Sequence, residues 1–261
     1  MATSLRSVQA GPGPTVEVER QARVDLAALF RMAVRHDWHE GIANHISLAI
    51  SGDGKRFLMN PQGRHWARIR ASDLLLLDAD GTGDVVGQGA GKADPTAWHI
   101  HSRIHARNPG ARCVMHTHMR YATTLACLKG YRLKMIDQNA MRFHGRIAYD
   151  DDFRGMALDD AEGRRIDGSI DAGKSVLFMA NHGITVVGRS VAEAFDENYY
   201  LDRACELQVL ALSTGQPLHE VTDEIAALTC RQWLEYPVDA CRDHFEEMKA
   251  ILDRDEPDYK D

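Results

Sequence analysis

The stretch Ala111-Arg-Cys-Val-Met-His116-Thr-His118-Met119 is a short apolar run that ends in a His-x-His pair. If residues 113–119 form a strand, alternate side chains share one face, so His116 and His118 project together at a spacing suited to two cis metal ligands. Such a pair equally fits a half-buried polar face of a strand. The best candidate for a third ligand is His182, which lies between the end of a second apolar run and a glycine.

The composition is typical of a globular protein. The chain has 261 residues, of which 44% are hydrophobic and 26% charged. Its length allows one large domain or two small ones, because a domain usually holds about 100–200 residues. The net charge of -7 and the lack of a basic stripe argue against a nucleic-acid partner. No window approaches the roughly 18 apolar residues of a membrane span, so we expect no membrane association.

The N-terminal residues and the cysteines bear on targeting and on redox state. Residues 1–14 lack the apolar segment of a signal peptide and end in Gly-Pro-Gly-Pro, so residues 1–15 are expected to form a flexible tail. The five cysteines are scattered, odd in number and form no Cys-x-x-Cys motif. They indicate neither a disulfide framework nor a thiolate zinc site, and we expect reduced thiols in a cytoplasmic protein.

The hydrophobic pattern predicts a single domain over residues 16–261, in which helices cover a mixed, mostly antiparallel sheet. Residues 72–77 fit either a helical turn or a strand, and residues 131–150 look irregular and polar, like a site wall or a solvated loop. The remaining elements follow from apolar spacing and from turn and capping residues. They are helices at 16–37, after Asp94-Pro95-Thr96, at 120–129, at 191–213 and twice after Pro217, and strands at 46–50, 56–59, 113–119, 174–180 and 184–187.

Several short motifs occur in the order found in one known family. They are Gly41-Ile-Ala-Asn44-His45-Ile-Ser47, Asn60-Pro-Gln-Gly63, Asp73-Leu-Leu, Asp80-Gly81, His116-Thr-His118, Asn181-His182-Gly183 and Tyr199-Tyr-Leu-Asp-Arg-Ala-Cys-Glu206. Together they resemble the class II aldolase/adducin superfamily over residues 16–215.

This resemblance implies a fold and a site. The implied fold is α/β, a three-layer α/β/α arrangement with a central mixed, mostly antiparallel sheet of about nine strands. The implied cofactor is one divalent metal ion per subunit (zinc, manganese or iron) on His116, His118 and His182. A homotetramer with active sites between subunits is also implied, and Asn44 and Gly63 are the family positions expected to contact the substrate.

One departure from the family pattern bears on the chemistry. The sugar-phosphate aldolases of the family carry Ser-Ser-Glu before the helix that precedes His-x-His, and the glutamate is their general acid/base. Counted back from His116 without gaps, these positions hold Pro95, Thr96 and Ala97. Alanine cannot transfer a proton, and proline offers neither a hydroxyl nor an N–H to a phosphate. The nearby Asp94 would place negative charge where a phosphate should bind.

The loss of the glutamate favours a carbon–carbon lyase that needs no such base. A metal on three neutral histidines keeps its charge and can act as a Lewis acid. Retro-aldol cleavage needs a base, whereas decarboxylation of a hydroxylated aromatic or heteroaromatic carboxylate needs charge stabilisation and then a proton donor. We therefore expect a decarboxylase of a small-molecule carboxylate. The alternatives are an aldolase acting on a non-phosphorylated hydroxy-oxo acid, a non-catalytic adducin-like interaction domain and, with iron, an oxygenase.

Further roles follow from side-chain chemistry. Arg142 or Arg64 is expected to bind a substrate carboxylate, and His144, backed by Tyr149, is expected to donate the proton. Each of these residues equally fits a surface or packing position. His99, near the position of the missing glutamate, is a candidate fourth ligand. His101 and His105, one helical turn apart, fit either a second metal site or a structural pair.

Overall fold

The computed structural model describes residues 15–158, 160–170, 173–236 and 239–261. Apart from Thr15, the expected tail lies outside the described residues. The described residues form one seven-stranded sheet, ordered β3-β2-β1-β4-β7-β6-β5, in which only the β5–β6 pair is parallel. The strands are β1 His45–Ala49, β2 Arg56–Met59, β3 Leu75–Asp78, β4 Cys113–Thr117, β5 Ile147–Asp150, β6 Val176–Met179 and β7 Gly183–Gly188.

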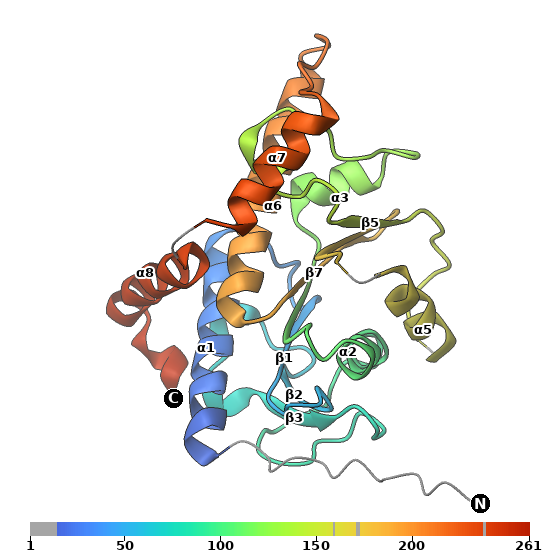
Figure 1. Cartoon of the computed structure of the whole chain (residues 1–261). Coiled ribbons are helices and arrows are strands. Elements are labelled where there is room, and N and C mark those ends of the chain that lie inside the picture. Colours follow the sequence, from blue (N-terminus) through green and yellow to red (C-terminus); the bar gives the residue numbers. More distant parts are fainter. Residues whose placement is uncertain (1–14, 159, 171–172, 237–238) are drawn as a thin grey trace, which may run out of the picture.

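Helices cover both faces of this sheet, which gives the predicted three-layer α/β/α fold (Figure 1). On one face lie α1 and α6, with α8 packed against them; on the other lie α2 and α5. None of the helices in the described ranges is long and apolar enough to cross a membrane. The helices are α1 Val16–Arg35, α2 Pro95–Arg107, α3 Arg120–Ala126, α4 Gln138–Met141, α5 Asp160–Ser169, α6 Val191–Ser213, α7 Asp223–Leu234 and α8 Ala240–Asp255.

Apolar side chains form separate cores on the two faces of the sheet. The larger core includes Leu29 of α1 and Phe195 of α6, both fully buried. On the opposite face, Ile104 of α2 and Ile166 of α5 pack on Val114 of β4. Strand β4 is buried over its whole length because it pairs with β1 on one side and β7 on the other. A motif on this strand is therefore held from both edges and both faces.

Two expectations for the elements were wrong, and one helix was not predicted. The sheet of the described residues has seven strands instead of about nine. The glycine-rich stretch after β3 makes strand-like bonds from Val86 N to Leu76 O (2.9 Å) and from Leu76 N to Gln88 O (3.2 Å), but forms no strand. Residues 131–150 are not wholly irregular, because they contain α4 and β5. Helix α5 was not predicted, since its sequence is polar and contains two glycines.

Candidate metal centre

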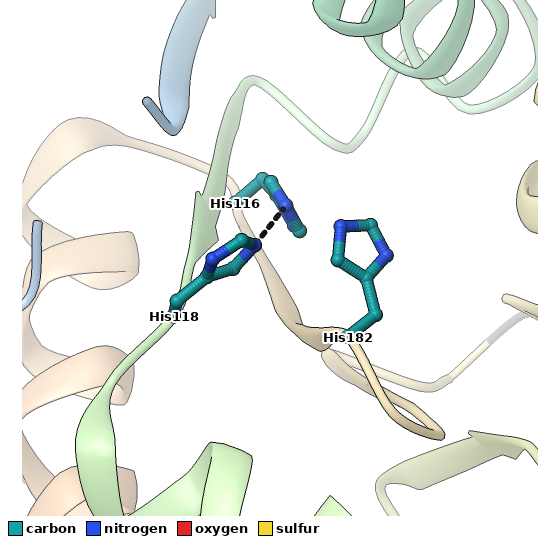
Figure 2. Close-up of side chains that lie close together, drawn as sticks. All are labelled: His116, His118 and His182. Atoms are coloured by element: carbon teal, nitrogen blue, oxygen red, sulfur yellow. Dashed lines mark hydrogen bonds between the residues drawn. The ribbon is translucent and has the colours of Figure 1, made fainter. Parts of the chain in front are cut away.

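Three histidines from two parts of the chain converge at one end of the central strands (Figure 2). One ligating atom from each of His116, His118 and His182 lies within 4.8 Å of the others. Their ring centroids are 4.7–5.1 Å apart. His116 lies in β4, His118 follows its last residue, and His182 lies in the turn between β6 and β7. The pairing of β4 with β7 therefore creates the cluster that the sequence predicted.

The hydrogen bond of His116 determines which of its nitrogens faces the cluster. His116 is buried, and its Nδ1 lies 3.0 Å from the carbonyl oxygen of Ile184 in β7. A carbonyl oxygen only accepts hydrogen bonds, so Nδ1 carries the proton and Nε2 presents a lone pair. This arrangement is the usual one for a metal-ligating histidine, whose other ring nitrogen donates to a carbonyl or a carboxylate.

His118 is oriented in the same way by a carboxylate. Its Nδ1 makes a short contact with Oε2 of Glu40, in the segment between α1 and β1. The carboxylate accepts a hydrogen bond from Nδ1–H of His118, which leaves Nε2 of His118 to face Nε2 of His116 at 3.2 Å. With both rings neutral, these are two lone pairs pointing at one another. A cation between them relieves that repulsion, and two ligands of a tetrahedral zinc at about 2.0–2.1 Å are about 3.3 Å apart.

The turn that carries His182 leaves no room for a larger residue beside it. Asn181 has a positive φ of 58°, and a Cβ on Gly183 would lie 2.6 Å from His118 Cδ2 and 2.7 Å from the Thr117 carbonyl oxygen. Only glycine at this position allows β7 to lie so close to the end of β4. The Asn-His-Gly motif thus has a steric reason as well as a ligand in it.

The cluster fits a divalent metal ion. Burial, followed by the neighbouring histidines, lowers the pKa of His116 well below its ordinary value. Burial and the nearby His118 likewise lower the pKa of His182 to about 4. Neutral imidazoles are the form that binds a metal, so these rings need lose no proton near neutral pH. Three imidazole donors with one open side match a catalytic zinc, manganese or iron site.

The open side of the cluster faces a cavity of about 730 Å³, a size suited to a small molecule. His118 and His182 form part of its wall. The carboxylates of Asp37 and Glu40 also line it, and Phe153 contributes an aromatic ring 6.2 Å from that of His182. The space beside the metal candidate is therefore partly apolar and partly acidic.

Helix α2 contributes Thr96 and Ile100 to the cavity wall, but not Ala97. Ala97 is fully buried and packs in an apolar cluster with Phe57 and Met59. The position aligned with the family's glutamate therefore lies in the core and carries no titratable group. Asp94, the N-cap of this helix, accepts hydrogen bonds from the backbone N–H groups of Thr96 (2.8 Å) and Ala97 (3.3 Å).

The two loops predicted to bind substrate lie together. Asn60 accepts a hydrogen bond from the backbone of Ile46 and donates to the carbonyl oxygen of Asn44, which ties the loop containing Gly63 to the loop before β1. Asn44 is buried with a positive φ of 68°, and its side-chain amide has no hydrogen-bond partner in the part of the chain that the structure describes. Arg64 forms an ion pair with Asp73 at 3.0 Å.

None of the predicted substrate-binding and proton-donating residues is among the described residues that line the cavity; these are Asn44, Gly63, Arg64, Arg142, His144 and Tyr149. Arg142 is buried in an ion-pair network with Asp196 and Glu197 of α6. His144 makes a hydrogen bond of 2.8 Å to the carboxylate of Asp223 at the start of α7. The Tyr149 hydroxyl accepts a hydrogen bond from a backbone N–H, and burial raises its pKa. Within a single chain, these residues do not meet the three histidines.

Two residues that contact the three histidines were not predicted from the sequence. Glu40 was not singled out, because a lone carboxylate carries no local signal of its partner. His45 was quoted as part of a motif but given no role, although its ring stacks on that of His116 with centroids 4.7 Å apart. The register of β1 on β4, which places these two histidines opposite each other, brings them together.

Neither of the predictions for additional ligands gains support from the geometry. His99 is not among the described residues that line the cavity. Both ring nitrogens of His101 and of His105 make hydrogen bonds within the chain. No nitrogen of this pair is left for a second metal ion, so the pair is hydrogen-bonded as a structural pair would be.

Comparisons with known proteins agree with this geometry. Residues 24–209 match the family described as Class II Aldolase and Adducin N-terminal domain. A Caulobacter vibrioides protein whose name refers it to aldolase class 2 is 37% identical over 204 residues, which span 78% of this chain and 77% of that protein. The crystal structure of an aldolase II superfamily protein from Pseudomonas syringae superimposes with a TM-score of 0.84 and 32% identity, over 93% of this chain and 96% of that one.

A more distant structure shares the fold. The L-fuculose 1-phosphate aldolase from Glaciozyma antarctica PI12 superimposes with a TM-score of 0.79 at 21% identity, over 96% of this chain and 97% of that one. The family match covers all seven strands of the described sheet and the three histidines. The chain therefore belongs to the class II aldolase and adducin N-terminal domain family.

Proposed function

We propose that this protein is a divalent-metal-dependent carbon–carbon lyase that decarboxylates a hydroxylated aromatic or heteroaromatic carboxylate. The observation that carries the proposal is a complete set of three metal-ligating histidines beside a helix that presents no acid or base to the cavity. A divalent ion held by these histidines would act as a Lewis acid on the substrate oxygens. In the reaction the bond to the carboxylate carbon breaks, carbon dioxide leaves, and a proton replaces it on the ring.

The start of α2 supports a substrate without a phosphate group. A helix N-terminus is a ready anion site because its first N–H groups are unpaired. Here the carboxylate of Asp94 already accepts from the N–H groups of Thr96 and Ala97, and Gln62 donates to its other oxygen at 3.0 Å. A phosphate would have to displace this carboxylate and overcome its negative charge.

Several side chains are available to hold the substrate. The buried, unpartnered amide of Asn44 supports a binding role, because a buried amide usually has hydrogen-bond partners. Arg64 is the better candidate of the two arginines for the substrate carboxylate, since its guanidinium is partly exposed whereas that of Arg142 is enclosed. Proton donation by His144 or Tyr149 stays a prediction, and it requires a neighbouring subunit.

Metal-loaded protein incubated with hydroxylated benzene and pyridine dicarboxylates is expected to release carbon dioxide, because the site stabilises charge without a catalytic base. The measurement is carbon dioxide release with zinc, manganese or iron(II) restored to metal-free protein. His219→Ala, which changes an exposed histidine outside the cavity, serves as the control for purification and folding. Cleavage of a sugar phosphate to an aldehyde at comparable efficiency would contradict the proposal.

Two other functions account for fewer observations. An aldolase acting on a non-phosphorylated hydroxy-oxo acid needs a base, and Asp37 and Glu40 are the carboxylates on the described cavity wall. Both are already hydrogen-bonded, Asp37 to Arg120 and Glu40 to His118. An adducin-like domain without catalysis leaves the converging histidines unexplained. Trapping of an aldehyde product supports the aldolase, and a metal-free protein by elemental analysis supports the interaction domain.

We also propose that the protein is a homotetramer with active sites completed between subunits. Large apolar side chains are exposed near the end of α6 and along α7, and contact with a neighbouring subunit would remove them from water. They include Leu207 (45% exposed), Leu210 (51%), Leu228 (40%) and Leu234 (63%). Light scattering after size-exclusion chromatography is expected to give the mass of four chains, and a monomer at micromolar concentration would contradict the proposal.

A further inference from the structure

A continuous row of hydrogen bonds runs from the interior of the protein to the wall of the cavity. It begins at the carbonyl oxygen of Ala111, which lies 2.9 Å from His105 Nδ1. His105 Nε2 lies 2.7 Å from Ser47 Oγ, which in turn lies 2.5 Å from His101 Nδ1. His101 Nε2 lies 2.7 Å from His45 Nδ1, and His45 is one of the residues that line the cavity. We call these four side chains the histidine row.

The chemistry of the first acceptor determines the direction of every bond in the histidine row. The Ala111 carbonyl can only accept, so His105 Nδ1 donates and its Nε2, in the neutral ring, accepts from the Ser47 hydroxyl. The Ser47 oxygen then accepts from His101 Nδ1, and His101 Nε2 accepts from His45 Nδ1. When each ring is neutral, this is the one arrangement of hydrogens in which every contact of the histidine row has one donor and one acceptor. His45 is therefore held with its proton on Nδ1 and a lone pair on Nε2.

Burial keeps the inner rings neutral. His101, His105 and Ser47 are fully buried. Burial is the main cause that lowers the pKa of His105 to about 4 and the pKa of His101 well below its ordinary value. A protonated ring would also leave two donors facing each other within the histidine row. The direction of the bonds is thus a property of the packed fold near neutral pH.

The ring of His45 lies beside the metal candidate, with its centroid 4.7 Å from that of His116. The His45 ring stacks on His116 with an angle of 27° between the rings, and its Nδ1 points to the interior through His101. Among the described residues, no group donates a hydrogen bond to His45 Nε2. Since His45 lines the cavity and its Nδ1 is already hydrogen-bonded to His101, Nε2 is the ring nitrogen left to accept a hydrogen bond from a bound molecule.

We propose that His45 is a specificity-determining residue that accepts a hydrogen bond from a hydroxyl group of the metal-bound substrate, and that His101, Ser47 and His105 position it to do so. A site that accepts a hydrogen bond from a substrate hydroxyl discriminates against an analogue that lacks the hydroxyl, because the buried acceptor is then left unpaired. The role given to His45 rests on the proposed metal-dependent function, which brings the substrate hydroxyl beside it.

Ligand binding to the zinc-loaded protein tests the role of His45 without needing the substrate. Benzohydroxamate and its 2-, 3- and 4-hydroxy derivatives chelate a metal through the same two oxygens, and calorimetry gives their dissociation constants. One hydroxylated isomer is expected to bind about tenfold more tightly than the parent, the gain of one hydrogen bond. His45→Phe should abolish this preference, and Ser47→Ala should reduce it.

Ser102→Ala is the matched control, because it removes a buried hydroxyl from α2 outside the histidine row and should preserve the preference. An equal preference in wild type and His45→Phe, or the absence of any preference in wild type, would overturn the role of His45. Failure of every hydroxamate to bind would instead contradict the metal centre, and with it the proposed function.

The tautomers provide a second test that requires no variant to fold. Proton–nitrogen correlation spectra of the histidine rings in the zinc-loaded wild-type protein should show His45, His101 and His105 protonated on Nδ1. A proton on Nε2 of His45 would overturn the positioning role of the histidine row and leave the proposed lyase function standing.

Discussion

Replacing His116 with alanine is expected to abolish tight metal binding, with at least about a 100-fold loss of affinity, because loss of a ligand should exceed the cost of losing a supporting hydrogen bond. The wild-type protein should retain one divalent ion per chain after dialysis, since one ligating atom from each of three imidazoles lies within 4.8 Å of the others. Elemental analysis measures the stoichiometry, and competition with a chelator dye measures the affinity. Carbon dioxide release should fall with metal occupancy.

Glu40→Ala is the graded companion to this experiment. Glu40 contributes no ligand atom but accepts a hydrogen bond from Nδ1–H of His118, so its loss should weaken metal binding by about 10-fold, the lower end of the range for such residues. The lower end applies because Glu40 is exposed and water can replace its oxygen. The exposed His219→Ala variant should bind metal as wild type does. Full metal occupancy in His116→Ala would rule out the three-histidine centre.

Arg142→Ala is expected to lower the free energy of unfolding by about 3–5 kcal/mol, the usual cost of removing one partner from a buried charge network. Asp196 and Glu197 are both buried, and Arg142 contacts both carboxylates. Its guanidinium also lies 4.4 Å from the ring centroid of Tyr200 and 5.0 Å from that of Trp233. Urea unfolding at pH 7, followed by circular dichroism, measures the loss.

The loss caused by Arg142→Ala should shrink in acid. Burial raises the pKa of Asp196. The hydrogen bond from His244 and the attraction to Arg142 outweigh this effect, so the pKa of Asp196 lies below its ordinary value. A carboxylate with a lowered pKa contributes stability above its unfolded pKa of about 3.9 and loses it as the pH falls through the folded value. The difference in the free energy of unfolding between wild type and Arg142→Ala should therefore be smaller below about pH 4 than at pH 7. Urea unfolding curves of both proteins at the two pH values measure it.

Arg203→Ala is the control, because Arg203 also pairs with a carboxylate on α6 but is 46% exposed. Its replacement should cost less than about 1 kcal/mol, as for other surface ion pairs. An Arg142→Ala variant as stable as wild type would contradict the structural role. Such a result would return Arg142 to the list of groups free to bind a substrate carboxylate.

Local patterns predicted many of the regular elements and the ligand set. The apolar spacing of residues 16–35, the Asp94 cap before α2 and the 23-residue helix α6 are visible because each depends on nearby residues. The fold class and the metal triad were predicted from motifs that occur in a known order. The resemblance also located the missing glutamate at Ala97, which the structure places in the apolar core.

Only the tertiary structure decided which polar residues share a space. His45 lies opposite His116 because of the register between β1 and β4. It contacts His101, which is 56 positions further along the chain, because α2 packs on β1. From the sequence, Arg142 looks like an exposed cation in a loop. In the structure it is buried and forms ion pairs with two carboxylates of α6. Sheet register and helix packing are long-range properties, and the periodicity of a single sequence carries only local ones. The sequence thus indicated the three candidate metal ligands, whereas the neighbours of these histidines depend on how the layers pack.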